Sequence, residues 1–134
     1  MKMMKPRHNS GQSLVELALL LPAILLLAIV TLDLGRGIYY YSAIYNAARE
    51  GARYGIVMQQ PYNSTPLYMT EIKEHAKALT IGLDSTKLYI PNPVIDGNML
   101  QVTVEYEFVP ITPIAIFGYE HIHMSSTSSM LIER

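Results

Sequence analysis

The chain has 134 residues, of which 50% are hydrophobic and 16% are charged, so it is more apolar than an average soluble domain. Its formal net charge is -1, which gives no sign of the basic surface that nucleic-acid-binding proteins present. Cysteine is absent, which excludes a disulfide scaffold and a thiolate metal site. These features favour one small domain attached to a membrane anchor.

The first predicted element is a helix whose N-terminal part crosses a membrane. Residues 17–32 carry no charge, and Leu14 and Val15 extend this apolar run across Glu16. The nineteen residues from 14 to 32 would span about 28 Å as a helix, close to the roughly 30 Å of a hydrocarbon layer. A buried helix in a soluble protein is the alternative interpretation, but the run shows no polar face.

The charges on either side of the apolar run predict its orientation. Residues 1–11 carry three cations and no acid, whereas Asp33 and Arg36 nearly cancel beyond the run. The positive-inside bias therefore puts the N-terminus in the cytoplasm and the rest of the chain outside. A removable secretory signal is the alternative, but residues 31–35 lack the small-residue pattern of its cleavage site.

Glu16 is the one ionisable residue within the run, and a carboxylate at membrane depth costs about 2.5 kcal/mol or more. One interpretation is that Glu16 lies near the interface and reaches water. The other needs a cut after Gly11, which would make Gln12 the new N-terminus, one helical turn before Glu16. The amine of one subunit could then neutralise the glutamate of its neighbour and set the axial register.

The chain resembles a known family over almost its whole length, and the specific motifs lie in its first third. Gly11-Gln-Ser-Leu-Val-Glu-Leu17 resembles the processing signal of prepilins, with glutamate at mature position five. The longer run to Pro22 resembles the start of TadE-like proteins. So do two later segments, Asp33-Leu-Gly-Arg-Gly37 and Asn46-Ala-Ala-Arg-Glu-Gly-Ala-Arg-Tyr54.

This resemblance implies cleavage between Gly11 and Gln12 by a membrane-embedded prepilin peptidase, which removes residues 1–11 as a basic leader peptide. It implies a minor pilin-like subunit, or pseudopilin, used with Glu16 in assembly of a tight-adherence (Flp) pilus or secretion machine. The implied partners are the peptidase, other pilin-like subunits, pilus assembly proteins and membrane lipid. The major pilins carry tyrosine after the glutamate, whereas this chain has Leu17, which argues against a major pilin.

The expected location is the bacterial inner (cytoplasmic) membrane, with the C-terminal domain outside and with incorporation into a pilus as a further step. The alternative function is an uncleaved single-pass adaptor of an envelope complex. Neither function implies enzymatic activity, a cofactor or a nucleic-acid partner.

The predicted helix continues past the membrane, so that residues 12–58 form one element. Ala43, Ala47, Gly51 and Gly55 recur every four residues and share one face of this helix. Small side chains allow another backbone to approach closely. The stripe could pack against the protein's own sheet or against the helix of another subunit.

Residues 59–134 are expected to form an extracytoplasmic domain, beginning with a short helix at Pro66. Tyr68, Ile72, Ala76 and Leu79 follow helical spacing, and Gly82 can end the helix. The polar loop before Pro66 separates it from the long helix.

Strands follow the short helix. From Leu100 to Phe108 apolar and polar residues alternate, which predicts a strand with one buried face. Asp96-Gly97 is a turn signal, so residues 88–95 should pair with the strand at residues 100–108 as a hairpin. Pro91 and Pro93 make residues 88–95 an edge strand. Adding a third strand at residues 122–132 gives an α+β fold with a three-stranded antiparallel sheet, similar to pilins.

One arrangement of candidate metal ligands remains. His121 and His123 would share a strand face, as would Glu105 and Glu107, and suitably paired strands could bring them together. Any solvated sheet face produces the same alternation, so the sequence predicts neither a metal site nor a catalytic residue.

Overall fold

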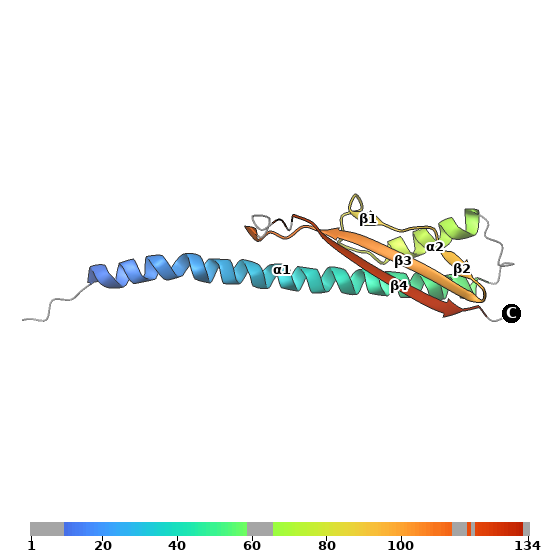
Figure 1. Ribbon diagram of the computed structural model, residues 1–134, viewed down its shortest axis with the longest axis horizontal. Coiled ribbons are helices and arrows are strands. Elements are labelled where there is room, and N and C mark those ends of the chain that lie inside the picture. The colour runs from blue at the N-terminus through green and yellow to red at the C-terminus, as the bar shows by residue number, and fades with distance from the viewer. Residues whose placement is uncertain (1–9, 59–65, 114–117, 119, 133–134) are drawn as a thin grey trace, which may run out of the picture.

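The computed structural model describes residues 10–58, 66–113, 118 and 120–132. It confirms the predicted α+β class: a long apolar helix continues into a small domain with a short helix and an antiparallel sheet (Figure 1). The elements in chain order are α1 (Ser10–Val57), α2 (Pro66–Ala78), β1 (Leu88–Tyr89), β2 (Val94–Asp96), β3 (Met99–Phe108) and β4 (Ile122–Leu131).

Helix α1 has 48 residues and runs without interruption through Pro22. At 1.5 Å per residue it is about 72 Å long. Every residue from 11 to 28 is exposed, because this part of α1 extends beyond the domain, as Figure 1 shows. The first contact with the domain that buries a side chain is at Asp33, one residue after the apolar run ends.

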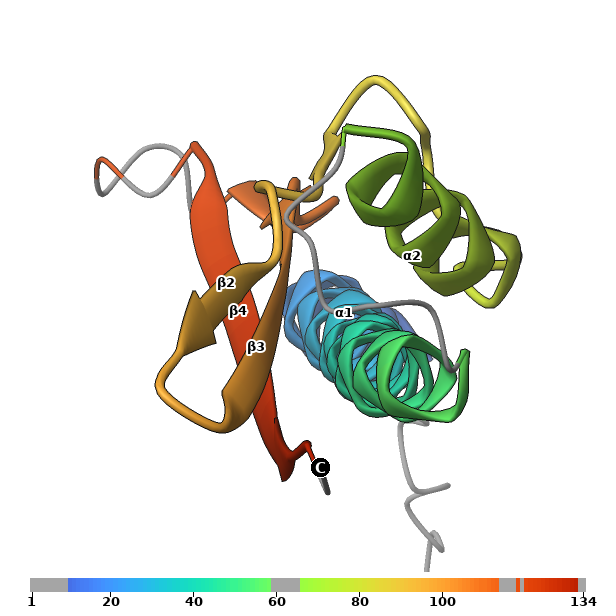
Figure 2. The ribbon, with the colours of Figure 1, turned by 90° about the vertical axis from the view of Figure 1, so that its right-hand side faces the viewer.

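The sheet is built around β3. One edge of β3 pairs with β4 over its whole length, from Met99 opposite Leu131 to Phe108 opposite Ile122. Its other edge pairs with β1 and with β2, and all pairs are antiparallel. Figure 2 shows α1 and α2 on the same side of this sheet, so the domain has two layers.

The predicted edge strand at residues 88–95 is divided into two short strands, which gives four strands in place of three. The pairing stops over residues 90–93, which contain Pro91 and Pro93. Proline has no N–H to give to the ladder, so two prolines in four residues end the pairing there. The Asp96-Gly97 turn signal is confirmed, since Gly97 has a φ of 59° in the turn between β2 and β3.

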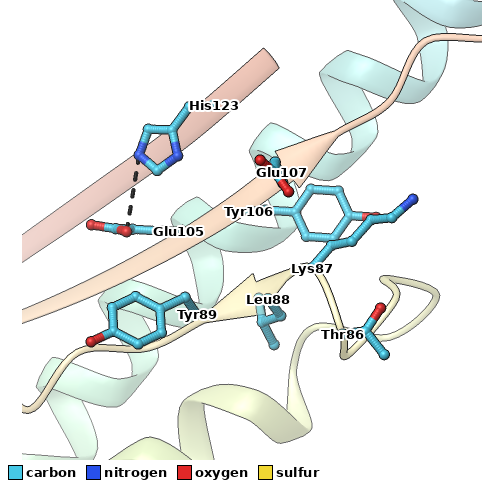
Figure 3. A pocket seen from close by; sticks show the side chains of 8 residues that line it. All are labelled: Thr86, Lys87, Leu88, Tyr89, Glu105, Tyr106, Glu107 and His123. Atoms are coloured by element: carbon cyan, nitrogen blue, oxygen red, sulfur yellow. Dashed lines mark ion pairs between the residues drawn. The ribbon is translucent and has the colours of Figure 1, made fainter. Parts of the chain in front are cut away.

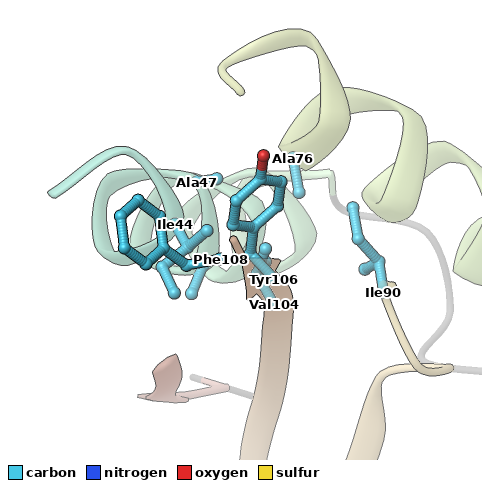
Figure 4. Packing of buried hydrophobic residues seen from close by; sticks show 8 residues of the cluster. Ile44, Ala47, Ala76, Ile90, Val104, Tyr106 and Phe108 are labelled. Carbon is cyan, nitrogen blue, oxygen red and sulfur yellow. The ribbon is translucent and has the colours of Figure 1, made fainter. Parts of the chain in front are cut away.

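The core lies between β3 and the two helices. The even-numbered residues of β3 from Leu100 to Phe108 are buried, as their alternation predicts. Figure 4 shows Phe108 beside Ile44 of α1, and Tyr106 between α1 and α2. A second cluster lies further along α1, where Leu100 and Val102 pack with Ile72 of α2.

Helix α2 buries Tyr68, Ile72 and Ala76 as predicted, but the prediction that Leu79 belongs to this face is wrong. The helix ends at Ala78, so helical spacing no longer applies to Leu79, which is 40% exposed. Thr80 is buried in its place, and its hydroxyl donates to the carbonyl of Lys77 at 2.7 Å.

Candidate functional site

The predicted cleavage segment lies in the first turns of α1, at the end that is remote from the domain (Figure 1). Gly11 and Gln12 are exposed. A Cβ atom added at Gly11 would meet no atom of the described residues within 4 Å, so the described part of the fold does not itself require glycine there. A requirement for a small residue at position 11 must therefore come from a partner that approaches this backbone.

Glu16 is also exposed, one helical turn after Gln12. Its carboxylate forms no ion pair among the described residues. The rest of the apolar run separates this glutamate from the domain. Any group that pairs with Glu16 inside a membrane must therefore lie near this end of α1.

The stripe of small residues lies where α1 contacts its own domain. Ala47, Gly51 and Gly55 are buried, and Ala43 is half-buried. A Cβ atom at Gly51 would lie 3.0 Å from the Cβ of Ala76, and one at Gly55 would lie 2.9 Å from the Cδ1 of Ile72. The stripe thus lets α2 and β3 approach α1 closely, and the Tyr68 hydroxyl donates to the Gly55 carbonyl in this buried contact.

At the other end of the domain, Asp33 joins α1 to the segment that follows β3. Its Oδ1 atom accepts the backbone N–H of Ile111 at 2.9 Å, and its Oδ2 atom accepts that of Thr112 at 2.6 Å. The Nη1 atom of Arg36 also donates to Oδ1 at 2.9 Å. We call these four residues the Asp33 junction.

Asp33 is only 7% exposed and lies just beyond the apolar residues 14–32. Burial alone would raise the pKa of this carboxyl. The N–H groups of Ile111 and Thr112, the Thr112 hydroxyl and Arg36 outweigh it and hold the pKa below its usual value of 3.8. The carboxylate is therefore charged at neutral pH and fully engaged with donors.

Arg36 is held from a second direction as well. Its guanidinium lies 5.6 Å from the ring centre of Tyr40 and 5.3 Å from that of Phe108. Phe108 belongs to the core beside α1, and Tyr40 packs against that core. The charge pair of the junction is thus attached to the apolar core on one side and to the segment after β3 on the other.

The sequence indicates this junction only weakly, because Asp33 and Arg36 stand out there only as flanking charges that nearly cancel. An acid and an arginine three residues apart, directly after an apolar run, are placed to pair on one helix face. That signal could have found the ion pair. It could not have found the two backbone donors, which lie 78 and 79 residues further along the chain.

A pocket of about 320 Å³ lies on the sheet face that points away from α1, and Figure 3 shows its lining. The Nε2 atom of His123 lies 4.0 Å from the Oε2 atom of Glu105, and the two side chains are 65% and 29% exposed. An exposed pair of this kind contributes little, since solvent screens it.

The other two candidate ligands do not complete a site. Glu107 lies opposite His123 in the β3–β4 register, but His121 precedes β4. Among the residues that the structure describes, no three His, Asp or Glu side chains come together in a way that could hold a metal ion.

By length and composition α1 can cross a membrane, and the rest of the described structure does not bury its most apolar segment. Residues 11–53 match the family model described as TadE-like protein. The resemblance to the TadE-like family is confirmed over this segment. No curated protein and no solved structure matches the chain.

The TadE-like segment contains most of the features described above. It begins at the proposed cleavage position, includes Glu16 and the Asp33–Arg36 pair, and ends within the stripe of small residues, before Gly55. The apolar helix indicates a membrane-anchored protein, and the family suggests an association with tight-adherence pili. The sheet and α2 lie outside the matched residues.

Proposed function

We propose that this TadE-like protein is a minor pilin-like subunit, processed by a prepilin peptidase and used to assemble a tight-adherence pilus or secretion machine. The observation that carries the proposal is the construction of α1. One unbroken helix provides an exposed apolar half, and its other half contributes one side of the core of the domain. A subunit built in this way can pack its apolar half against other apolar helices when it leaves the bilayer.

Processing after Gly11 is the first step of this function. The peptidase would cut between Gly11 and Gln12 and release the basic residues 1–11 on the cytoplasmic side. Gly11 is exposed, and a Cβ atom there would meet no atom of the described residues within 4 Å, so no described side chain shields its backbone from a protease that must approach closely. The new amine at Gln12 would lie about 6 Å along the helix from Glu16.

Pairing between neighbouring subunits is the second step. An unpartnered carboxylate at membrane depth is unfavourable, and an amine from a neighbour would neutralise it. The pair would form only when two helices are in the correct axial register. Glu16 would therefore select the register of assembly, while the Asp33 junction holds each domain on its own helix.

An uncleaved single-pass adaptor of an envelope complex is the second candidate. The observation that favours it is the start of α1 at Ser10, which puts the Gly11–Gln12 bond inside the first helical turn. Proteases act most readily on segments that are not held in regular structure, so this turn would have to open before cleavage.

Intact-mass measurement of the membrane-extracted chain distinguishes the two candidates. In cells with an active prepilin peptidase, we expect a chain that starts at Gln12, and in cells without it a chain that keeps residues 1–11. In cells with the active peptidase, Gly11→Leu should block cleavage. Gly35→Leu is the matched control and should still be cleaved. A full-length chain in both strains would support the adaptor. Sheared filaments, separated from membranes and probed for this protein, then show whether the mature chain enters the pilus.

A further inference from the structure

An apolar groove of about 790 Å³ lies where α1 leaves the membrane-spanning residues and meets the ends of β3 and β4. One wall is formed by four residues of α1 at intervals of four, namely Leu26, Val30, Leu34 and Ile38. The facing wall is formed by Phe108, Pro110, Pro113, Ile122 and Met124. Its volume is within the range of about 300–1,000 Å³ that is common for small-molecule sites.

The Asp33 junction and Gly37 give the groove its shape. The junction fixes the backbone of Ile111 and Thr112 on α1, which holds the wall formed by the neighbouring prolines in place. Gly37 lies in the lining and has no side chain to fill the space. Within the described part of the chain, a Cβ atom there would meet the Cε of Met124 alone, at 3.8 Å.

The lower part of the groove belongs to the membrane. A hydrocarbon layer of about 30 Å that starts near Leu14 would end about twenty helical residues later, near Asp33 and Leu34. Leu26 and Val30 then lie at the depth of the acyl chains, while Ile38 lies beyond them. The groove is therefore continuous with the hydrocarbon, and an acyl chain can enter it without crossing water.

The lining changes from apolar to polar along the groove, as a phospholipid does from its acyl chains to its headgroup. Among the described lining residues Asp33 alone is charged, and its carboxylate is already engaged with Ile111, Thr112 and Arg36. Tyr41 and Ser42 line the end that is remote from the membrane, and their hydroxyl groups suit the headgroup level. Leu34 and Ile38 are 63% and 61% exposed, so this apolar surface has no cover from the described domain.

We propose that the groove binds one phospholipid of the outer leaflet. One of its acyl chains packs against Leu26, Val30 and Leu34, and its glycerol and headgroup lie near Tyr41 and Ser42. The site requires that the protein is anchored in a membrane, but it does not depend on cleavage after Gly11 or on entry into a pilus.

The test uses the full chain, reconstituted in vesicles of phosphatidylethanolamine and phosphatidylglycerol and re-extracted in a mild detergent. Native mass spectrometry should show one retained phospholipid per chain. Gly37→Leu puts a side chain into the groove and should lower retention about tenfold or more, because it removes the space for the ligand. Gly35→Leu is the matched control, since a Cβ atom there meets nothing within 4 Å, and it should retain the lipid.

A photoreactive residue at position 38 gives a second measurement. Because Ile38 is exposed, this substitution does not require a side chain to be placed inside the groove. We expect a covalent adduct with the mass of a phospholipid in the purified chain, and none when the residue is placed at position 35. Equal retention in the Gly35 and Gly37 variants, or no retained lipid in the wild type, would overturn the proposal. So would crosslinking of position 38 to a second copy or to another subunit, which would make the groove a protein interface.

Discussion

Replacing Asp33 with alanine should destabilise the domain by about 2–4 kcal/mol, since hydrogen bonds to a charged group contribute about 1.5–3 kcal/mol each. The bond to the buried Thr112 N–H, at 2.6 Å, should be lost in full. The other two donors count for less, because Ile111 is 65% exposed and the Arg36 side chain is 35% exposed, so both can turn to water.

Asp33→Asn should have an intermediate effect of about 1–2 kcal/mol, because the amide keeps one acceptor oxygen and turns an NH2 group toward the second N–H donor. Glu50→Gln is a control on the same helix. Glu50 also pairs with an arginine three residues later, but this pair is exposed, so no measurable change is expected.

The measurement is denaturant unfolding of the full chain in detergent micelles, together with hydrogen exchange at the amides of Ile111 and Thr112. Both variants should speed exchange at these amides, and the alanine variant should do so more strongly. If Asp33→Ala left both the unfolding free energy and the exchange rates of these two amides unchanged, the junction would hold nothing in place, and the reasoning would be refuted.

Three further predictions concern pH, packing and assembly. The depressed pKa of Asp33 means that its contribution is complete above its unfolded pKa near 3.8 and is lost as the pH falls through the lower folded value. The difference in unfolding free energy between the wild type and Asp33→Asn should therefore shrink only below about pH 4, and a constant difference would contradict it. Gly55→Ala should destabilise the domain by about 1–3 kcal/mol through overpacking, partly offset by the higher helix propensity of alanine. Gly35→Ala is the control, because it should show the gain in helix propensity without the overpacking. Equal stability of the two variants would contradict the close contact at Gly55. Glu16→Gln should remain cleaved and in the membrane but lose crosslinks to its pilus partners, and normal crosslinking with normal adherence would show that the glutamate only reaches water at the interface.

Local patterns in the sequence were sufficient for most of the fold. The long helix was predicted at residues 12–58 and is found at Ser10–Val57, because an apolar run followed by helical periodicity specifies it almost alone. The alternation in β3 likewise identified its buried face. The division of its partner into β1 and β2 follows from Pro91 and Pro93, but how much of the pairing survives depends on the neighbouring strand.

The remaining features depend on contacts between distant residues. Whether Leu79 or Thr80 is buried depends on where α2 ends, and helical spacing alone does not give that residue. Asp33 contacts Ile111 and Thr112 only after β3 has packed on α1. The two walls of the groove come from segments that are far apart in the sequence, so the groove could not be predicted from either segment alone.

The attachment of α1 to its domain at two separated points also determines how the subunit responds to a pulling force. The Asp33 junction lies at one end of the contact, and the buried bond from Tyr68 to the Gly55 carbonyl lies at the other. The separation of 22 residue steps from position 33 to position 55 corresponds to about 33 Å of helix. In Figure 1, β3 and β4 extend alongside this part of α1. Tension applied along the anchor would therefore act on the whole interface in shear, so that many contacts must slide together before any one of them is released.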